Sequence, residues 1–406
     1  MTTTDFNPQN INTSFLEDCR NEGDPLADQT IQLILDHSDL STLNQVFLKL
    51  VNNDSLSLTH FEQFSPKIKQ ALEGYFTASS TLPDWYNAAL IQQAEAVFSE
   101  YGPEIFMLLN VSALPMCYTC AKGAQVLYDT GRLMSHQKDI EPLSRRLMET
   151  GQMIFNVLSQ GGLSPQGNGI ITIQKVRLIH ASIRYYLLHK PHQNGFTWNV
   201  KSFGLPINQE DLAGTLMSFG PVILNGLKKL DIPLTEEQLN AYMHCWQVVG
   251  YLMGVKQELN PATFTQGFDL ASSILKHQAA ASEAGAALTS SCLSFLKYHV
   301  PGNAFDEVPA FMMHYFLADF SEATDKPLAA FIGVDQPENL KDSLVLKFSQ
   351  YLSRDLSKLE THHLIKHLSA VFNKVLLQGI IKHFNGNKSV HFFVPESLTK
   401  NWELNK

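Results

Sequence analysis

Residues 170–189, IITIQKVRLIHASIRYYLLH, carry the pattern that decides the fold. Apolar residues recur in this segment at intervals of three and four, which is the spacing of one face of an α-helix. Val176, Ile183 and Leu187 lie on such a face. His180 shares that face, so the helix directs its imidazole towards a core. The segment therefore predicts a buried helix with one histidine on its apolar side.

The same spacing recurs along most of the 406 residues, whereas alternating, strand-like runs are almost absent. We therefore expect an all-α fold with one large helical bundle. The polar stretch 1–80, which ends in the linker TASSTLPDW, predicts an N-terminal helical extension. Residues 81–290 form the expected main domain, and residues 291–406 form a C-terminal helical region. Expected helices cover residues 28–35, 43–51, 86–100, 104–114, 117–128, 142–158, 170–189, 267–290, 310–320 and 362–384.

Helix ends are marked by capping residues and turn-forming loops. Asn208 with Asp211, and Thr235 with Gln238, have the spacing of N-terminal capping pairs. The loop SQGGLSPQGNG at 159–169 is rich in Gly and Pro and must turn the chain. It predicts that the helices before and after it are antiparallel neighbours.

Composition excludes several classes of protein. Hydrophobic residues make up 44% of the chain and charged residues 17%, which excludes a disordered protein. The net charge of −9 and the lack of a basic stripe argue against a nucleic-acid surface. The uncharged run 105–121 contains Asn110 and Pro115 and is shorter than the about 20 apolar residues of a membrane span, so it predicts a buried helix.

The N-terminus and the cysteines point to a cytoplasmic protein. MTTTDFNPQNINTSFLEDCR has neither a basic nor an apolar region of the kind that signal peptides contain. Five cysteines are sparse and odd in number, which is unlike a disulfide framework. We expect a cytoplasmic chain with free thiols.

Cys117 and Cys120 form a Cys-x-x-Cys pair, which suits a redox dithiol, half of a zinc site or covalent haem attachment. Covalent attachment would need a histidine after Cys120, where Ala121 stands. A zinc site would need a second ligand pair, and Cys245 and Cys292 are isolated in the sequence. We favour two small residues on one face of a core helix.

A histidine cluster near the C-terminus is a weaker candidate for metal binding. His362, His363 and His367, with Glu360, give one Glu-x-x-His spacing. A carboxylate-bridged di-iron site needs two such motifs and two further glutamates. A solvated helix face is the favoured interpretation, and binding of stray divalent metal is the alternative.

The surroundings of His180 are unusual for a core histidine. Arg177 and Arg184 lie one turn before and one turn after it, and the helix has no acidic residue to pair with them. The preceding helix adds Arg146 and Thr150, which are one turn apart. A b-type haem needs one axial nitrogen, cations for its propionates and a polar group over its oxygen-binding face, so these residues suggest a haem pocket.

Five segments together resemble the rubber oxygenase (latex-clearing protein) family, which also contains the ER-bound oxygenase of mycophenolic acid biosynthesis. The resemblance covers residues 80–260 and rests on TGR at 130–132, RRLMET at 145–150, KVRLIHASIR at 175–184, GLPINQEDLAGTL at 204–216 and WQVVGYLMGV at 246–255. It implies an all-α haem b protein that uses dioxygen to cleave carbon–carbon double bonds of isoprenoid chains.

Site residues follow from the resemblance position by position. His180 matches the proximal haem ligand of the family, and Arg146 and Thr150 match an arginine and a threonine on the helix over the haem. Arg177 and Arg184 match arginines that flank the axial histidine, and we expect them to contact the haem propionates.

Two positions depart from the rubber-cleaving members. Glu149 stands where those members have a lysine before the threonine. Asp129 and Thr130 stand where those members have a glutamate proposed as a base. Those members are also exported. The resemblance therefore implies haem binding but not rubber cleavage, and a soluble isoprenoid or other unsaturated lipid is the expected substrate.

Three hypotheses follow. The leading one is a haem b-dependent oxygenase whose partners are dioxygen and a hydrophobic small-molecule or lipid substrate. The alternative is a non-catalytic haem- or lipid-binding helical protein that acts as a carrier, sensor or interaction module. In the third, the motifs serve packing alone. The segment PINQEDL offers Asn208, Gln209, Glu210 and Asp211 together, but its place at a helix start favours capping and loop fixing over catalysis.

Overall fold

A computed structural model of the chain describes residues 6–52, 58–134, 141–165, 167–189, 197–300, 306–334 and 361–384. The described residues are helical with no strand, which confirms the all-α prediction. The α-helices are α1 (Thr13–Cys19), α2 (Pro25–Asp36), α3 (Leu40–Asn52), α4 (Pro66–Ser79), α5 (Ala88–Leu108), α6 (Leu114–Thr119), α7 (Ala121–Met134), α8 (Glu141–Leu158), α9 (Asn168–His189), α10 (Val200–Phe203), α11 (Gln209–Phe219), α12 (Pro221–Lys229), α13 (Glu236–Leu252), α14 (Phe264–Gln278), α15 (Glu283–His299), α16 (Val308–Leu317), α17 (Leu328–Phe331) and α19 (Thr361–Phe384).

Shorter helical turns join some of these elements. They are η1 (Pro8–Asn10), η2 (Leu58–Phe61), the π-helical turn η3 (Leu109–Ala113), η4 (Gln257–Leu259) and η6 (Ala318–Ala323). None of the described helices is long and apolar enough to cross a membrane. The run 105–121 is largely buried, as predicted, and η3 interrupts its α-helical course.

The chain forms two compact units, each made of separate stretches. The first unit comprises residues 1–95, 153–213 and 241–262, and the second comprises residues 96–152, 214–240 and 263–406. The sequence predicted boundaries at residues 80 and 290. The two units are divided differently, because the N-terminal stretch belongs to the same unit as the helix that carries His180.

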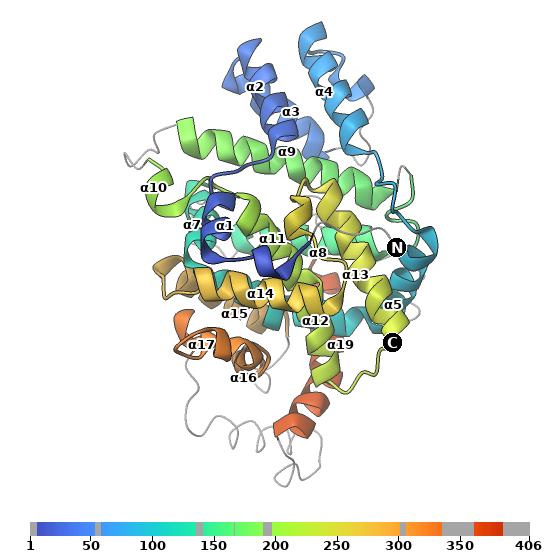
Figure 1. Cartoon of the computed structure of the whole chain (residues 1–406), viewed down its shortest axis with the longest axis vertical. Coiled ribbons are helices and arrows are strands. Elements are labelled where there is room, and N and C mark those ends of the chain that lie inside the picture. Colours follow the sequence, from blue (N-terminus) through green and yellow to red (C-terminus); the bar gives the residue numbers. More distant parts are fainter. Residues whose placement is uncertain are drawn as a thin grey trace. The chain divides into compact units, whose positions relative to one another are not determined.

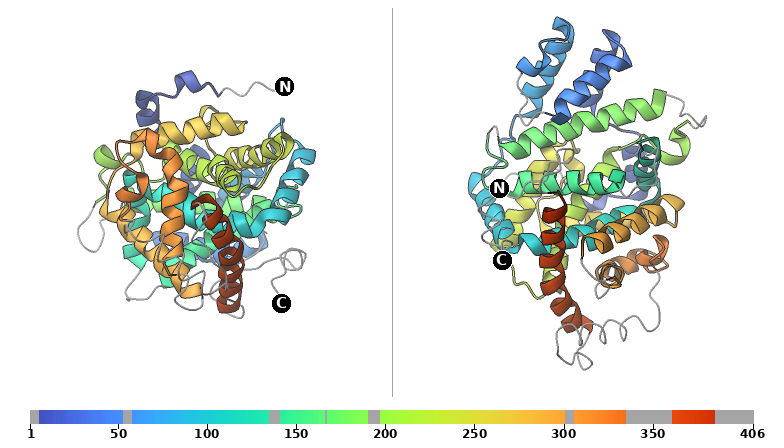
Figure 2. Two further views of the ribbon diagram at one scale, coloured as in Figure 1. Left: turned by 90° about the horizontal axis from the view of Figure 1, so that it is seen from below. Right: turned by 180° about the vertical axis from the view of Figure 1, so that it is seen from behind.

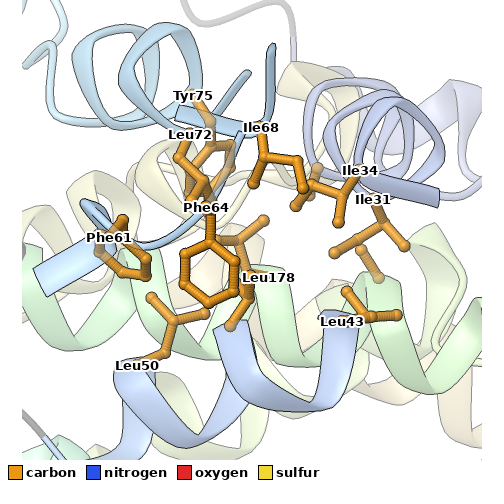
Figure 3. Close-up of a cluster of buried hydrophobic side chains, with 13 residues drawn as sticks. Ile31, Ile34, Leu43, Leu50, Phe61, Phe64, Ile68, Leu72, Tyr75 and Leu178 are labelled. Carbon is orange, nitrogen blue, oxygen red and sulfur yellow. The ribbon is translucent and has the colours of Figure 1, made fainter. Parts of the chain in front are cut away.

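In the first unit, α2, α3 and α4 lie on the same side of α9 (Figure 1). Local sequence starts these helices: Asp24 caps α2 and Ser65 caps α4, and each is followed by a proline at the first helical position. Their apolar faces enclose a core with Leu178 and Ala181 of α9 (Figure 3). The remaining members of this N-terminal core are Ala27, Ile31, Ile34, Leu43, Val46, Leu50, Phe61, Phe64, Ile68, Leu72 and Tyr75.

The second unit is centred on η3 and α15. The turn η3 packs against α6, α12 and α16, and α15 packs against α6, α7, α16 and α19. Helices α16 and α17 lie side by side (Figure 2). Gly226 of α12 allows a close approach, since a Cβ atom there would lie 2.6 Å from Leu108 Cδ2.

Two expected helices are each divided in the structure. The helix expected over 117–128 breaks at Cys120, whose backbone pairs with Ala279. The helix expected over 267–290 is divided into α14 and α15, because Ser282 starts a new helix by accepting a hydrogen bond from the Gly285 N–H. Tertiary backbone pairing and an overlooked cap therefore override the local periodicity.

Conversely, the helices expected over 86–100 and 104–114 are joined in the structure. Helix α5 runs through Pro103, with a local distortion at Tyr101. Both predicted capping pairs are confirmed: Asp211 N–H donates to Asn208 Oδ1 at 3.0 Å, and Thr235 and Gln238 exchange hydrogen bonds.

The N-terminal core yields a stability prediction. Leu72 is fully buried in it, so Leu72→Ala should lower the free energy of unfolding by about 2–5 kcal/mol through lost burial and a residual cavity. Gln70→Ala, on the exposed face of the same helix, is the matched control and should change it by less than about 0.5 kcal/mol. Chemical denaturation followed by circular dichroism measures both, and equal losses would show that α4 is not packed on this core.

Candidate functional site

His180 lies near the middle of α9 and is half-buried. Among the described residues, none forms a hydrogen bond to its imidazole. Burial, aided by the positive charge of Arg184, lowers the pKa of His180 to about 4. At neutral pH the side chain is therefore an uncharged imidazole with a lone pair free for a ligand bond. This is the donor that a b-type haem requires on its proximal side, so the residue fits that group.

The arginine before His180 forms a buried ion pair with the N-terminal segment. Arg177 Nη2 lies 2.8 Å from Asp24 Oδ1, and Arg177 Nε donates to the other oxygen of the same carboxylate. Arg177 Nη1 also donates to the Leu252 carbonyl at 3.0 Å. Asp24 is 2% exposed and Arg177 is 8% exposed, so water screens this bidentate pair only weakly.

The arginine after His180 is also paired with an aspartate, but the side chain of this aspartate is 36% exposed. Arg184 Nε donates to Asp28 Oδ1 at 2.9 Å, and Arg184 Nη1 donates to the Ile207 carbonyl at 2.6 Å. Asp24 and Asp28 are one turn apart at the start of α2. The two aspartates and two arginines, named here the aspartate–arginine clamp, therefore hold α9 on both sides of His180.

A glycine makes the Arg177 pair sterically possible. Gly254 has a φ of +77°, and a Cβ atom there would lie 2.5 Å from Arg177 Nη2. Only glycine suits both this backbone conformation and the close approach of the guanidinium. The last glycine of WQVVGYLMGV thus serves to seat Arg177.

A third buried arginine joins the N-terminal segment to the segment that starts α11. Arg20 Nη1 donates to Glu210 Oε2 at 3.1 Å and to Asp211 Oδ1 at 2.9 Å. Gln209 Nε2 donates to the carbonyl of Gly23 at 2.7 Å and to that of Gly254 at 3.0 Å. These contacts bear out loop fixing as the role of the PINQEDL segment.

These contacts revise the prediction for Arg177 and Arg184. We expected their guanidinium groups to meet haem propionates, because α9 itself has no acidic residue. The structure instead gives them Asp24 and Asp28, which sequence reasoning missed. The two aspartates lie about 150 positions earlier in the chain. The helical spacing between them was the one sequence feature that could have pointed to them as partners.

The predicted oxygen-side residues lie on α8. Thr150 is half-buried, and the side chain of Arg146 lies outside the part of the chain that the structure describes. Both belong to the second unit, and His180 belongs to the first. Glu149 is exposed, and Asp129 on α7 accepts a hydrogen bond from Gln125 Nε2 at 2.8 Å.

The two weaker candidates give no metal centre. Cys117 lies in α6 and Cys120 follows that helix, so the expectation of one shared helix face was wrong. None of the five cysteines, all of which lie within the described residues, forms a disulfide. His363 on α19 is exposed, and the side chains of His362 and His367, like Glu360, lie outside the described residues. Within the described ranges, no three His, Cys, Asp or Glu side chains gather as a metal site.

Comparison with known proteins agrees with this architecture. Residues 108–342, more than half of the chain, match the profile of the family "ER-bound oxygenase mpaB/B'/Rubber oxygenase, catalytic domain". The chain belongs to this oxygenase family. His180, Arg177 and Arg184 all lie within the matched span, whereas Asp24 and Asp28 lie before it.

Two relatives of the oxygenase family are similar to the chain. The rubber oxygenase of Streptomyces sp. (strain K30) is 21% identical over 268 residues, which is 66% of this chain. The chain spans 61% of the length of that relative. A solved structure of latex clearing protein LCP in the closed state matches with a TM-score of 0.67 at 18% identity, covering 88% of this chain and 91% of that one. This likeness shows a shared fold.

The aspartate–arginine clamp makes a testable contribution to stability. Asp24→Asn keeps a side chain that can cap α2 but leaves the Arg177 guanidinium buried without a counter-charge. We expect the free energy of unfolding to fall by about 3 kcal/mol, as measured by chemical denaturation.

Asp39→Asn is the matched control, because Asp39 also caps a helix through the Thr42 N–H but is exposed. Its unfolding midpoint should match that of the unaltered chain. Indistinguishable midpoints for the Asp24 and Asp39 variants would contradict a stabilising role for the buried pair.

Proposed function

We propose that this member of the oxygenase family is a haem b-dependent oxygenase in which His180 holds the iron. The observation that carries the proposal is the state of His180: a half-buried imidazole, uncharged at neutral pH, on a helix fixed by ion pairs on either side. A histidine that served packing alone would be expected to bond to a neighbour, and no described residue bonds to this imidazole.

The residues around His180 act by positioning. Arg177 and Arg184 form ion pairs with Asp24 and Asp28. We therefore propose that they fix the rotation of α9 about its axis and its position along that axis. Burial and the positive charge of Arg184 also favour the uncharged form of the imidazole. When bound, haem supplies the redox chemistry that activates dioxygen.

On the resemblance to the family alone, we assign Arg146 and Thr150 to the oxygen side of the haem. Their spacing of one turn places them on the same face of α8. A guanidinium and a hydroxyl can each donate a hydrogen bond to negative charge that develops on oxygen during the reaction. Neither side chain can be a strong iron ligand, which suits a side that must stay open to a small molecule.

The substrate class follows from the family and from the departures of this chain. We propose an unsaturated isoprenoid or other lipid-like molecule, cleaved at a carbon–carbon double bond with dioxygen to give carbonyl products. The relative from Streptomyces is named a rubber oxygenase, and this chain has Glu149 where rubber-cleaving members carry a lysine. A smaller substrate than polymeric rubber is therefore favoured.

A haem- or lipid-binding protein without turnover is the second candidate. Two departures from the rubber-cleaving members favour it. Glu149 replaces their lysine, and Asp129 and Thr130 stand where they have the glutamate that is proposed as a catalytic base. Oxygen consumption separates the two candidates.

Haem binding is tested by absorption spectroscopy. The full chain reconstituted with haemin should show a Soret band, and His180→Ala should abolish the spectrum of the histidine-ligated form. His189→Ala is the control, since His189 lies on the same helix but is exposed and stacked on Tyr185. An unaltered spectrum in the His180 variant would exclude this residue as the ligand.

Turnover is tested by oxygen uptake with a polyprenyl substrate and detection of aldehyde products. Thr150→Val should lower turnover about tenfold, equivalent to one transition-state hydrogen bond of ~1.4 kcal/mol, and leave the Soret band in place. Thr215→Val, at an exposed threonine of α11, should leave the rate unchanged. Full haem loading without oxygen uptake across several alkenes would instead support the binding protein.

A further inference from the structure

A groove of about 470 Å³ lies between α2 and α4 in the first unit, and none of the predicted haem residues lines it. This volume is in the range of about 300–1,000 Å³ that is typical of small-molecule sites. The groove also precedes residues 108–342, the span that matches the oxygenase profile. The side chains that line it are Leu26, Gln29, Thr30, Leu33, His37, Lys67, Gln70, Ala71, Gly74 and Tyr75.

The two helices run in opposite directions along the groove. The start of α2 is bonded to α9 through Asp24 and Asp28, and the end of α4 is bonded to α9 through Tyr75 and Ser79. His37 follows the last residue of α2, and Lys67 is the second residue of α4. Both therefore lie at the end of the groove that is farther from these bonds.

Two of the polar side chains that line the groove are already hydrogen-bonded within the protein. The Thr30 hydroxyl donates to the Leu26 carbonyl at 2.8 Å, and the Tyr75 hydroxyl donates to the Gln174 carbonyl at 2.7 Å. Neither hydroxyl donor is thus free for a ligand. Leu33 keeps 47% of its surface exposed, so its side chain is available to an apolar ligand.

Gly74 shows that the groove is open where α4 faces it. A Cβ atom at this position would meet no atom within 4 Å, although Gly74 lies inside a helix where alanine would be more stable. A larger side chain at residue 74 would therefore extend into the groove and fill part of it. This provides a direct way to block the site.

Charge distinguishes the two ends of the groove. No lining residue is acidic, although the whole chain has a net charge of −9. At the outer end, Lys67 offers a cation and Gln70 and His37 offer hydrogen-bond donors. Towards the inner end, Leu26 and Gly74 offer no polar side-chain group, and Gln29 is uncharged. A ligand that fits this division has one anionic head and an apolar chain.

We propose that the groove between α2 and α4 binds a long-chain monocarboxylate, with its carboxylate at Lys67 and His37 and its apolar chain along Leu26, Leu33 and Ala71. The site is separate from His180, so its occupation does not depend on haem. It would give the chain a second lipid site outside the oxygenase domain.

The probe is oleate, compared with oleyl alcohol, which has the same chain but no charge. Binding is measured by isothermal titration calorimetry on the full chain, both haem-free and haem-loaded. Lys67→Glu should weaken oleate binding about tenfold and leave binding of the alcohol unchanged. Lys201→Glu, an exposed lysine of α10, controls for net charge and should have no such effect.

Gly74→Leu should weaken binding of both probes at least tenfold, because it fills the groove. Gly74→Ala is its matched control and should keep most of the affinity while raising the melting temperature slightly. If the leucine variant does not fold, the effect of Lys67→Glu on oleate binding still tests whether the groove binds the carboxylate.

Three outcomes would overturn the proposal. Oleate affinity that is unchanged by Lys67→Glu would exclude the carboxylate contact. Oleate binding that is lost on haem loading would place the ligand at His180 instead. A dimer of this chain that dissociates in Gly74→Leu, without oleate binding, would show that a second copy covers the groove. The first and third outcomes are read on the haem-free chain, so they do not depend on whether the chain binds haem or is an oxygenase.

Discussion

Two guanidinium groups are buried on the helix that carries His180, and a buried cation is tolerated only beside a counter-charge. Helix α9 contains no acid, so Asp24 and Asp28 of α2 supply that charge from about 150 positions earlier in the chain. Each aspartate accepts two hydrogen bonds from one arginine, which fixes direction as well as distance. Removing either aspartate would leave a buried guanidinium without its counter-charge.

This constraint ties the rest of the first unit together. The carbonyls of Leu252 and Ile207 accept further hydrogen bonds from Arg177 and Arg184, respectively, and Gly254 leaves room for the Arg177 guanidinium. Arg20 and Gln209 then join the N-terminal segment to the start of α11. Three of the five segments that resemble the rubber oxygenase family therefore meet around α2. The N-terminal helices pack on the helix that carries His180, and two of them, α2 and α4, form the groove proposed to bind a carboxylate.

Much of the fold could be predicted from the sequence because helix formation is largely local. Periodicity located α2, α8, α9 and α19, and short capping patterns marked the starts of α11 and α13. The breaks at Cys120 and near Ser282 were missed, because backbone pairing with Ala279 and a new cap decide them. Within the candidate site, His180 could be predicted, because the residue pattern that singles it out lies within one helix. The partners of Arg177 and Arg184 were not predictable, because an ion pair between distant segments leaves no periodic pattern in either one.

The central claim is that the aspartate–arginine clamp holds His180 in position to bind haem. Titration of the Asp24→Asn/Asp28→Asn double variant with haemin tests it directly, at a temperature where circular dichroism shows full helical content. We expect haemin affinity at least tenfold below that of the unaltered chain, with a Soret band that no longer has the form of a single histidine-ligated species. Unchanged affinity and an unchanged band in the folded double variant would contradict the claim.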